Sequence, residues 1–323
     1  MRLSVIGAGN HSALHHGAAL AEYRRAHPGA IDLAGVCDLD AAKAAEYARR
    51  FGFATTYTSA SEMIAREKPD GLIVVTQPNV TAAIGPELLS RRIPLLLEKP
   101  PGDTSDQTRA LLRAAETGGT PHMVSLNRRY IPAVRKAREW LARRGETAAP
   151  RITIARMLRA ARREAGFAVG TGIHVIDTVL CLMGAPRRAF TVKSAMESPG
   201  SFFFDTILDF GPGRSASIVI SPDVGTEEET FEIHGPGYCI LIDSMRCSVR
   251  ILEEKRETLS WAAAESDPFV FRCGSLGETE AFVSAIREGK GFWPTLGDAL
   301  VSMVACEAVD AGGEVSIPEQ RES

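Results

Sequence analysis

An apolar segment that runs directly into two glycines is the feature that most constrains the fold of this chain. Leu3-Ser4-Val5-Ile6 predicts a buried strand, and Gly7-Ala8-Gly9-Asn10-His11-Ser12 follows it and opens a segment of helical composition. In this G-x-G-x-x-S pattern, Gly7 permits a tight turn and Gly9 lets a pyrophosphate approach the backbone at a helix N-terminus. Ser12 replaces the usual third Gly or Ala and is small enough for close packing of helix and strand. The start of the chain therefore predicts a dinucleotide-binding turn.

The remainder of residues 1–125 alternates apolar strands with helices. Asp40, Ser59 and Thr104 are expected to cap the starts of three of these helices, and Gly52 is expected to end the first of them. The strands after the first are expected at Ile31–Cys37, Gly71–Val75, Pro94–Leu97 and Met123–Leu126. Nearly continuous apolar strands that alternate with helices indicate a parallel sheet covered on both faces. We therefore predict an α/β, doubly wound Rossmann domain over residues 1–125.

Residues 126–323 show a different pattern, in which a helix is followed by many short strands. Breaks such as Gly211-Pro212-Gly213 and Gly235-Pro236-Gly237 separate some of these strands, and two helices near residues 276–288 and 295–311 follow them. Strands are expected at residues 151–158, 189–196, 202–210, 216–221, 229–233, 239–242 and 248–252. This order predicts an α+β second domain built on an antiparallel sheet.

Asp38 follows the second strand and bears on the choice of dinucleotide. A carboxylate at this place can accept hydrogen bonds from ribose hydroxyls, and it would repel a 2′-phosphate. Leu39 offers no compensating positive charge. We therefore favour NAD over NADP, with a helix-initiating acid as the alternative interpretation of Asp38.

Composition excludes several function classes. The net charge of −3 lacks the basic excess of a nucleic-acid or membrane-surface binder. No apolar run reaches the length of about 20 residues that a membrane span needs. The six cysteines form no C-x-x-C pattern and have no histidines at zinc-finger spacing, so we expect free thiols, no metal and a cytoplasmic location.

Four further motifs give the chain a family resemblance. They are Thr76-Gln77-Pro78-Asn79, Leu97-Glu98-Lys99-Pro100, Asn127-Arg128-Arg129-Tyr130 and Gly172-Ile173-His174-Val175-Ile176-Asp177. In this order, and after the glycine turn, they resemble the Gfo/Idh/MocA family (glucose–fructose oxidoreductase, inositol dehydrogenase and rhizopine catabolism proteins). The E-K-P sequence at residues 98–100 is the most specific of the set.

The resemblance implies an NAD(P)-binding Rossmann domain and a second domain, residues 126–323, with a mostly antiparallel open sheet for substrate binding and oligomerisation. It implies hydride transfer at a sugar, cyclitol or related polyol, and a homodimer or homotetramer. The residues that it assigns to the cofactor, together with those of the turn, are Gly7, Gly9, Asn10, His11, Asp38, Thr76, Gln77, Pro78, Asn79, Glu98, Lys99 and Asn127.

Alcohol oxidation needs a base for the hydroxyl proton and a positive group for the developing alkoxide. Lys99 suits the second role and His174 suits the first, because an imidazole exchanges protons near neutrality. Asp177, Arg128 and Tyr130 are the candidate substrate ligands. A surface lysine and a histidine in a helix core are the alternative interpretations of Lys99 and His174.

Gly170 and Thr81 depart from the family pattern, which has an acid and a histidine at these positions. The missing acid motivates a second hypothesis, a catalytically impaired sensor or partner protein that binds a dinucleotide and a ligand. A third hypothesis is a reductase of a non-sugar carbonyl or imine on the same scaffold.

Overall fold

The computed structural model describes residues 1–145, 149–162 and 166–318. The chain divides into two compact units, and each is described by itself. The first unit comprises residues 1–127 and 274–299, and the second comprises residues 128–273 and the chain from residue 300 onward.

A parallel six-stranded sheet forms the centre of the described first unit, with the strand order β3-β2-β1-β4-β5-β6. The order reverses beside β1, as in a doubly wound fold. The strands are β1 (Arg2–Ile6), β2 (Asp32–Cys37), β3 (Thr55–Tyr57), β4 (Gly71–Val74), β5 (Leu95–Glu98) and β6 (His122–Ser125). The predicted Rossmann architecture is confirmed.

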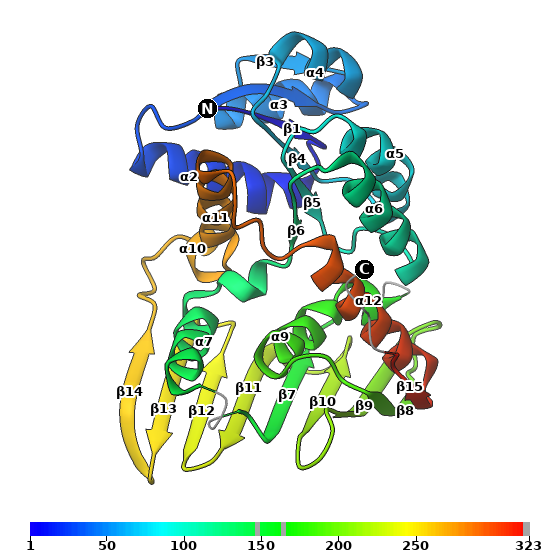
Figure 1. Cartoon of the computed structure of the whole chain (residues 1–323), viewed down its shortest axis with the longest axis vertical. Helices are drawn as coiled ribbons and strands as arrows, with labels where there is room; N and C mark the ends of the chain where they lie inside the picture. Colours follow the sequence, from blue (N-terminus) through cyan, green and yellow to red (C-terminus); the bar gives the residue numbers. More distant parts are fainter. Residues whose placement is uncertain (146–148, 163–165, 319–323) are drawn as a thin grey trace. The chain divides into compact units, whose positions relative to one another are not determined.

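Helices cover both faces of this sheet, with α2 and α11 on one side and α5 and α6 on the other (Figure 1). The helical segments are α1 (Asn10–Ser12), a π-helical turn (Ala13–Gly17), α2 (Ala18–Ala26), α3 (Ala41–Phe51), α4 (Ala60–Glu67), α5 (Pro78–Ser90), α6 (Ser105–Gly118) and α11 (Ser275–Glu288). The three predicted N-caps are confirmed, because the side chains of Asp40, Ser59 and Thr104 each accept a backbone N–H of the first turn.

The second unit contains a nine-stranded sheet with the order β14-β13-β12-β11-β7-β10-β9-β8-β15 among the described residues. All neighbouring pairs are antiparallel except β7 and β10. The strands are β7 (Ile152–Leu158), β8 (Arg188–Ala195), β9 (Phe202–Asp209), β10 (Ser215–Ser221), β11 (Glu228–Gly235), β12 (Tyr238–Asp243), β13 (Ser248–Glu253), β14 (Arg256–Ala262) and β15 (Gly313–Ser316). This agrees with the expected α+β class and mostly antiparallel sheet.

The helices α7 and α9 lie on the same face of this sheet (Figure 1). Besides α11, the helical segments that follow β6 along the chain are a 3₁₀ turn (Asn127–Tyr130), α7 (Pro132–Arg144), α8 (Phe167–Gly170), α9 (Ile173–Met183), α10 (Phe269–Arg272) and α12 (Leu296–Ala311). Along β8 and β9, buried and more exposed residues alternate, as expected for a sheet with one covered face. On its other face, Val192 and Ile207 are 64% and 51% exposed.

The extent of the second domain differs from our expectation of residues 126–323. Residues 274–299 belong to the first unit, because the apolar side of α11 is buried there. A Cβ on Gly71 of β4 would lie 2.6 Å from Ile286 and 3.3 Å from Phe282, both on α11.

Three strands had no expected counterpart: β3, β14 and β15. They are short or lie at a sheet edge, and their exposed residues carry no continuous apolar run.

Candidate functional site

The glycine turn connects β1 to α1 in the first unit, and its two glycines have different structural demands. Gly7 has a φ of +103°, and a Cβ there would lie only 2.0 Å from the carbonyl oxygen of Val75. Gly9 has an ordinary φ of −73°, and no described atom lies within 4 Å of the position that its Cβ would take. The fold therefore requires glycine at position 7, whereas the open space at Gly9 is available to a ligand.

Asp38 joins the turn to the end of β2. Its Oδ2 accepts the backbone N–H of Ala8 at 2.8 Å, and its Oδ1 accepts that of Asp40 at 3.0 Å. The carboxylate is only partly buried, so its remaining lone pairs can accept hydroxyl groups. The structure thus places Asp38 beside the turn, where a ribose-binding acid is expected.

A cavity of about 290 Å³ lies between this turn and α3. Gly9 and Asn10 line it on one side, and Lys43, Tyr47 and Arg50 line it on the other. The preference for NAD that was drawn from Asp38 and Leu39 did not consider the positive charges of Lys43 and Arg50. These two residues of α3 come near the turn only in the folded chain, where they line the same cavity.

The other predicted cofactor residues of the first unit follow the carboxyl ends of its strands. Thr76, Gln77, Pro78 and Asn79 follow β4 and begin α5, and the Thr76 and Thr81 hydroxyls are 2.7 Å apart. Glu98 ends β5, Lys99 follows it, and Asn127 lies just beyond β6. Because carboxyl ends of parallel strands share one edge, these residues and the glycine turn belong to the edge where doubly wound folds bind ligands.

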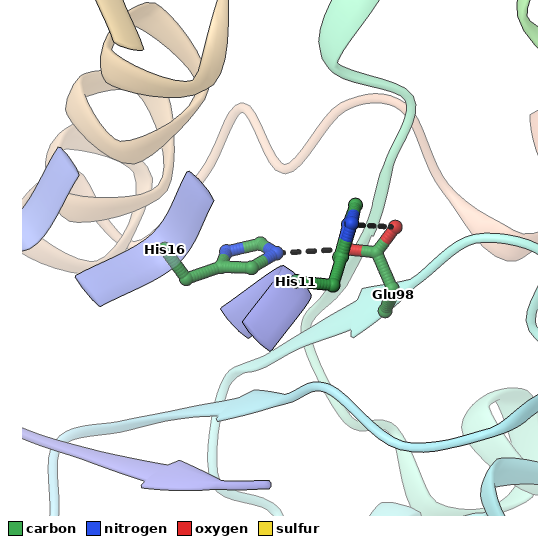
Figure 2. A group of neighbouring side chains, drawn as sticks. All are labelled: His11, His16 and Glu98. Atoms are coloured by element: carbon green, nitrogen blue, oxygen red, sulfur yellow. Dashed lines mark hydrogen bonds and ion pairs between the residues drawn. The ribbon is translucent and has the colours of Figure 1, made fainter. Parts of the chain in front are cut away.

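Glu98 lies between two imidazoles of the helix that follows the glycine turn (Figure 2). Its Oε2 is 2.7 Å from His16 Nε2, and its Oε1 is 3.3 Å from His11 Nε2. Burial alone would raise the pKa of Glu98, but the hydrogen bonds and charges of the two histidines hold it well below 4.5. The sequence reasoning had identified Glu98 and His11 but missed His16, whose only signal was its position in the first helix.

Glu278 is a second buried carboxyl group, and α11 brings it into the first unit. Its Oε2 accepts the Ser125 hydroxyl at 2.8 Å, while its Oε1 is buried without a hydrogen-bond partner among the described residues. Burial and the nearby charge of Glu98 together raise the pKa of Glu278 well above 4.5. The pKa values of these two neighbouring buried carboxyl groups are thus shifted in opposite directions.

The second unit holds the other predicted catalytic residue, His174. It is the second residue of α9, its side chain is buried, and its backbone N–H donates to Thr171. Gly170, where the family pattern has an acid, ends α8 only four residues earlier. No described atom lies within 4 Å of the position that a Gly170 Cβ would take, so an acid would fit there.

Asp177 is engaged by other side chains of the second unit rather than exposed to a ligand. Arg129 donates to both of its oxygens, at 3.0 and 2.8 Å, and the Ser302 hydroxyl donates at 2.7 Å. Asp177 is 1% exposed. We had expected a substrate ligand; the observed arrangement is a buried ion pair that joins the segment before α7 to α9.

Arg128 and Tyr130, the other expected substrate ligands, lie on the 3₁₀ turn before α7. Arg128 Nε donates to Glu229 Oε1 at 3.0 Å, and Arg159 binds the other oxygen of the same carboxylate. Burial alone would raise the pKa of Glu229, but the two arginines lower it below 4.5. Tyr130 is buried. Sequence reasoning missed Glu229, which is fully buried on β11.

The fold and the turn together define the first unit as a Rossmann domain of the NAD-binding type. Residues 1–126 match the Gfo/Idh/MocA family model, described as an oxidoreductase family with an NAD-binding Rossmann fold. The match covers the first unit's N-terminal part, the same region as the glycine turn and the E-K-P motif, and it agrees with the resemblance drawn from the motifs.

Two curated relatives and one solved structure illustrate the similarity. The rhizopine catabolism protein MocA of Rhizobium meliloti is 29% identical over 43% of this chain, but the match covers only 41% of that protein. Levoglucosan dehydrogenase of Pseudarthrobacter phenanthrenivorans is 25% identical over 78% of this chain and 72% of its own length. A levoglucosan dehydrogenase solved with NADH and L-sorbose superposes with a TM-score of 0.86 at 19% identity, covering 99% of both chains. That likeness shows the fold.

No helix in the described part of the chain is both long and apolar enough to cross a membrane.

Proposed function

We propose that this protein is an NAD-dependent oxidoreductase that transfers hydride between nicotinamide and a hydroxyl-bearing carbon of a sugar, cyclitol or related polyol. The observation that carries the proposal is the glycine turn at the carboxyl edge of the parallel sheet, with open space at Gly9 and Asp38 fixed beside it. The substrate class is supported by the dehydrogenases of sugars among the relatives.

The residues at the turn fit a dinucleotide. Gly9 leaves room for a pyrophosphate against the start of the helix, whose N-terminal N–H groups favour an anion. Asp38 provides acceptors for ribose hydroxyls and a negative charge that opposes a 2′-phosphate, which supports NAD over NADP. Lys43 and Arg50 line the adjacent cavity, so comparison of NADH and NADPH affinities tests this preference directly.

Two residues are assigned the chemistry. When bound, the nicotinamide supplies the hydride acceptor or donor. Lys99 stabilises the negative charge that develops on the substrate oxygen, and His174 accepts the hydroxyl proton, as their matches to the E-K-P and G-x-H-x-x-D motifs support.

Two variants test these roles. A panel of sugars, cyclitols and polyols is screened for NAD reduction, and kcat and KM are then measured for the best substrate. We expect Lys99→Met and His174→Ala each to lower kcat by at least about 100-fold, the range that an acid–base group or charge stabiliser contributes. Unchanged turnover in both variants would show that the assignment is wrong.

Gly170 favours a second candidate function, a protein that binds a dinucleotide and a small ligand but has lost catalysis. A Cβ on Gly170 would meet no described atom within 4 Å beyond its neighbours in the chain, so Gly170→Asp is a suitable variant to restore the missing acid. If the wild type reduces no member of the panel and Gly170→Asp gains dehydrogenase activity, the binding protein is the correct function. Reduction of NAD by the wild type with any substrate excludes it.

The exposed face of the nine-stranded sheet supports a homo-oligomer. Phe190 and Ile207 are register partners on β8 and β9, and both are exposed apolar residues. Ile152 of β7 and Val192 of β8 are also exposed. Contiguous apolar patches on a soluble protein mark interaction sites. Light scattering on the wild type and on Ile207→Lys tests the assembly, because a charge at this position should dissociate a dimer that uses this face.

A further inference from the structure

We propose that His11, His16 and Glu98 form a binding site for a divalent transition-metal ion of the zinc class. The two Nε2 nitrogens and a carboxylate oxygen of Glu98 all lie within 4.8 Å of one another. All three residues belong to the first unit, and the inference does not rest on the proposed redox function.

The π-helical turn at Ala13–Gly17 explains how the two histidines reach one carboxylate. His11 and His16 are five residues apart, which on a regular α-helix would point them about 140° away from each other. Here the N–H of Ala18 donates to the carbonyl of Ala13, the i→i+5 bond of a π-turn. The wider turn brings both imidazoles to the same side, where they converge on Glu98 (Figure 2). Such turns are frequent at functional sites.

The donor set fits the chemistry of zinc and its neighbours. Two imidazole nitrogens and one carboxylate are a common set for Zn²⁺ or Fe²⁺ sites that keep open positions. With bonds of about 2.0–2.2 Å and tetrahedral angles, the donor atoms would lie about 3.4 Å apart. The distances from Glu98 oxygens to His11 and His16, 3.3 and 2.7 Å, are close to this spacing. Since the three donor atoms lie within 4.8 Å of one another, the side chains must move closer together to hold one ion.

The surroundings provide an entry path for an ion and polar groups beside its ligands. The His11 side chain is 50% exposed, whereas His16 and Glu98 are buried, so an ion can enter past His11. The His15 ring lies 4.5 Å from the His11 ring, and His15 Nδ1 is 3.0 Å from the Ser275 hydroxyl oxygen. The contact with Ser275 fixes the orientation of the His15 imidazole, which packs against the proposed metal ligand His11. The carboxyl group of Glu278 lies near enough to Glu98 for the two charges to interact, and its buried Oε1 has no hydrogen-bond partner among the described residues.

The test measures metal binding to the full chain with no dinucleotide or substrate present. The chain is stripped with a chelator and titrated with Zn²⁺ by calorimetry and with Co²⁺ by visible absorption, which reports the coordination of the ion. His11→Ala is the main variant, because this residue is exposed and its loss should not unfold the protein. His27→Ala is the matched control, since His27 is an exposed histidine just after the same helix and does not belong to the cluster.

We expect one equivalent of Zn²⁺ per chain in the wild type and in His27→Ala, and at least about a tenfold weaker affinity in His11→Ala, in line with losing one of three ligands. The Co²⁺ spectrum and a Zn²⁺-dependent rise in Tm should follow the same order. Absence of stoichiometric binding to the wild type, or equal affinity in His11→Ala, would overturn the proposal and leave the cluster as a hydrogen-bonded ion pair. NADH affinity, measured separately on the metal-free chain, tests the proposed function independently.

Discussion

Replacing each glycine of the turn by alanine should separate the needs of the fold from the needs of the ligand. At Gly7 the φ of +103° is strained for any L-residue, which costs about 1–3 kcal/mol. The added Cβ would also lie 2.0 Å from the Val75 carbonyl oxygen, so β1 and β4 must move apart. We therefore expect Gly7→Ala to lose at least about 3 kcal/mol of unfolding free energy, a Tm decrease of about 6–12 °C.

Gly9→Ala should behave in the opposite way. Its φ of −73° suits alanine, and the Cβ meets nothing within 4 Å, so the Tm should change by no more than about 2 °C. The methyl group, however, fills the space through which a pyrophosphate would approach the backbone. Displacing that anion by about 1 Å breaks hydrogen bonds to charged groups worth about 1.5–3 kcal/mol. We therefore expect the Kd for NADH to rise at least about tenfold.

The assay pairs thermal unfolding with NADH binding by fluorescence or calorimetry. Gly225→Ala is the control, because Gly225 lies in the second unit and its Cβ would also meet nothing within 4 Å. It should change neither Tm nor NADH affinity. Wild-type NADH affinity in a fully stable Gly9→Ala protein would refute the placement of the pyrophosphate at this turn.

Three further predictions concern buried carboxyl groups. Asp177→Ala removes the carboxylate that pairs with the buried Arg129, so urea titration should show a loss of about 3–5 kcal/mol. A raised KM with unchanged stability would instead favour the role of substrate ligand. Two arginines lower the pKa of Glu229 in the folded protein. The Glu229 carboxylate therefore stabilises the protein above its unfolded pKa, and this contribution is lost as the pH falls through the folded pKa. Between about pH 6 and pH 3, Tm should fall less steeply in Glu229→Gln than in the wild type. The pKa of Glu278 in the folded protein is instead raised well above 4.5, so its contribution to stability is full below the unfolded pKa and is lost as the pH rises through the folded pKa. From about pH 5 to pH 8, Glu278→Gln should therefore lose less stability than the wild type. Identical profiles of stability against pH in the two proteins would contradict the raised pKa.

Much of the fold was predictable because its signals are local. Apolar strands, N-caps such as Asp40 and the glycine turn each depend on a few neighbouring residues, whose conformational preferences agree with the tertiary structure. The Rossmann domain could therefore be predicted from the sequence. The edge strands β3, β14 and β15 could not, because their half-exposed residues carry no comparable apolar pattern.

The candidate site likewise has features that the sequence predicts and features that it does not. The sequence by itself predicted that Gly7 permits a tight turn, that Asp38 follows the second strand, and that Lys99 and His174 stand in recognisable motifs. Only the tertiary structure decided what each carboxylate faces. Glu98 meets His16 across 82 residues and Asp177 meets Ser302 across 125, and the burial of an ionised group forces such distant partners together. Because the partners are far apart in the sequence, no local pattern predicts these pairs. They form in the folded protein because a charge that is buried without a partner costs a large amount of free energy.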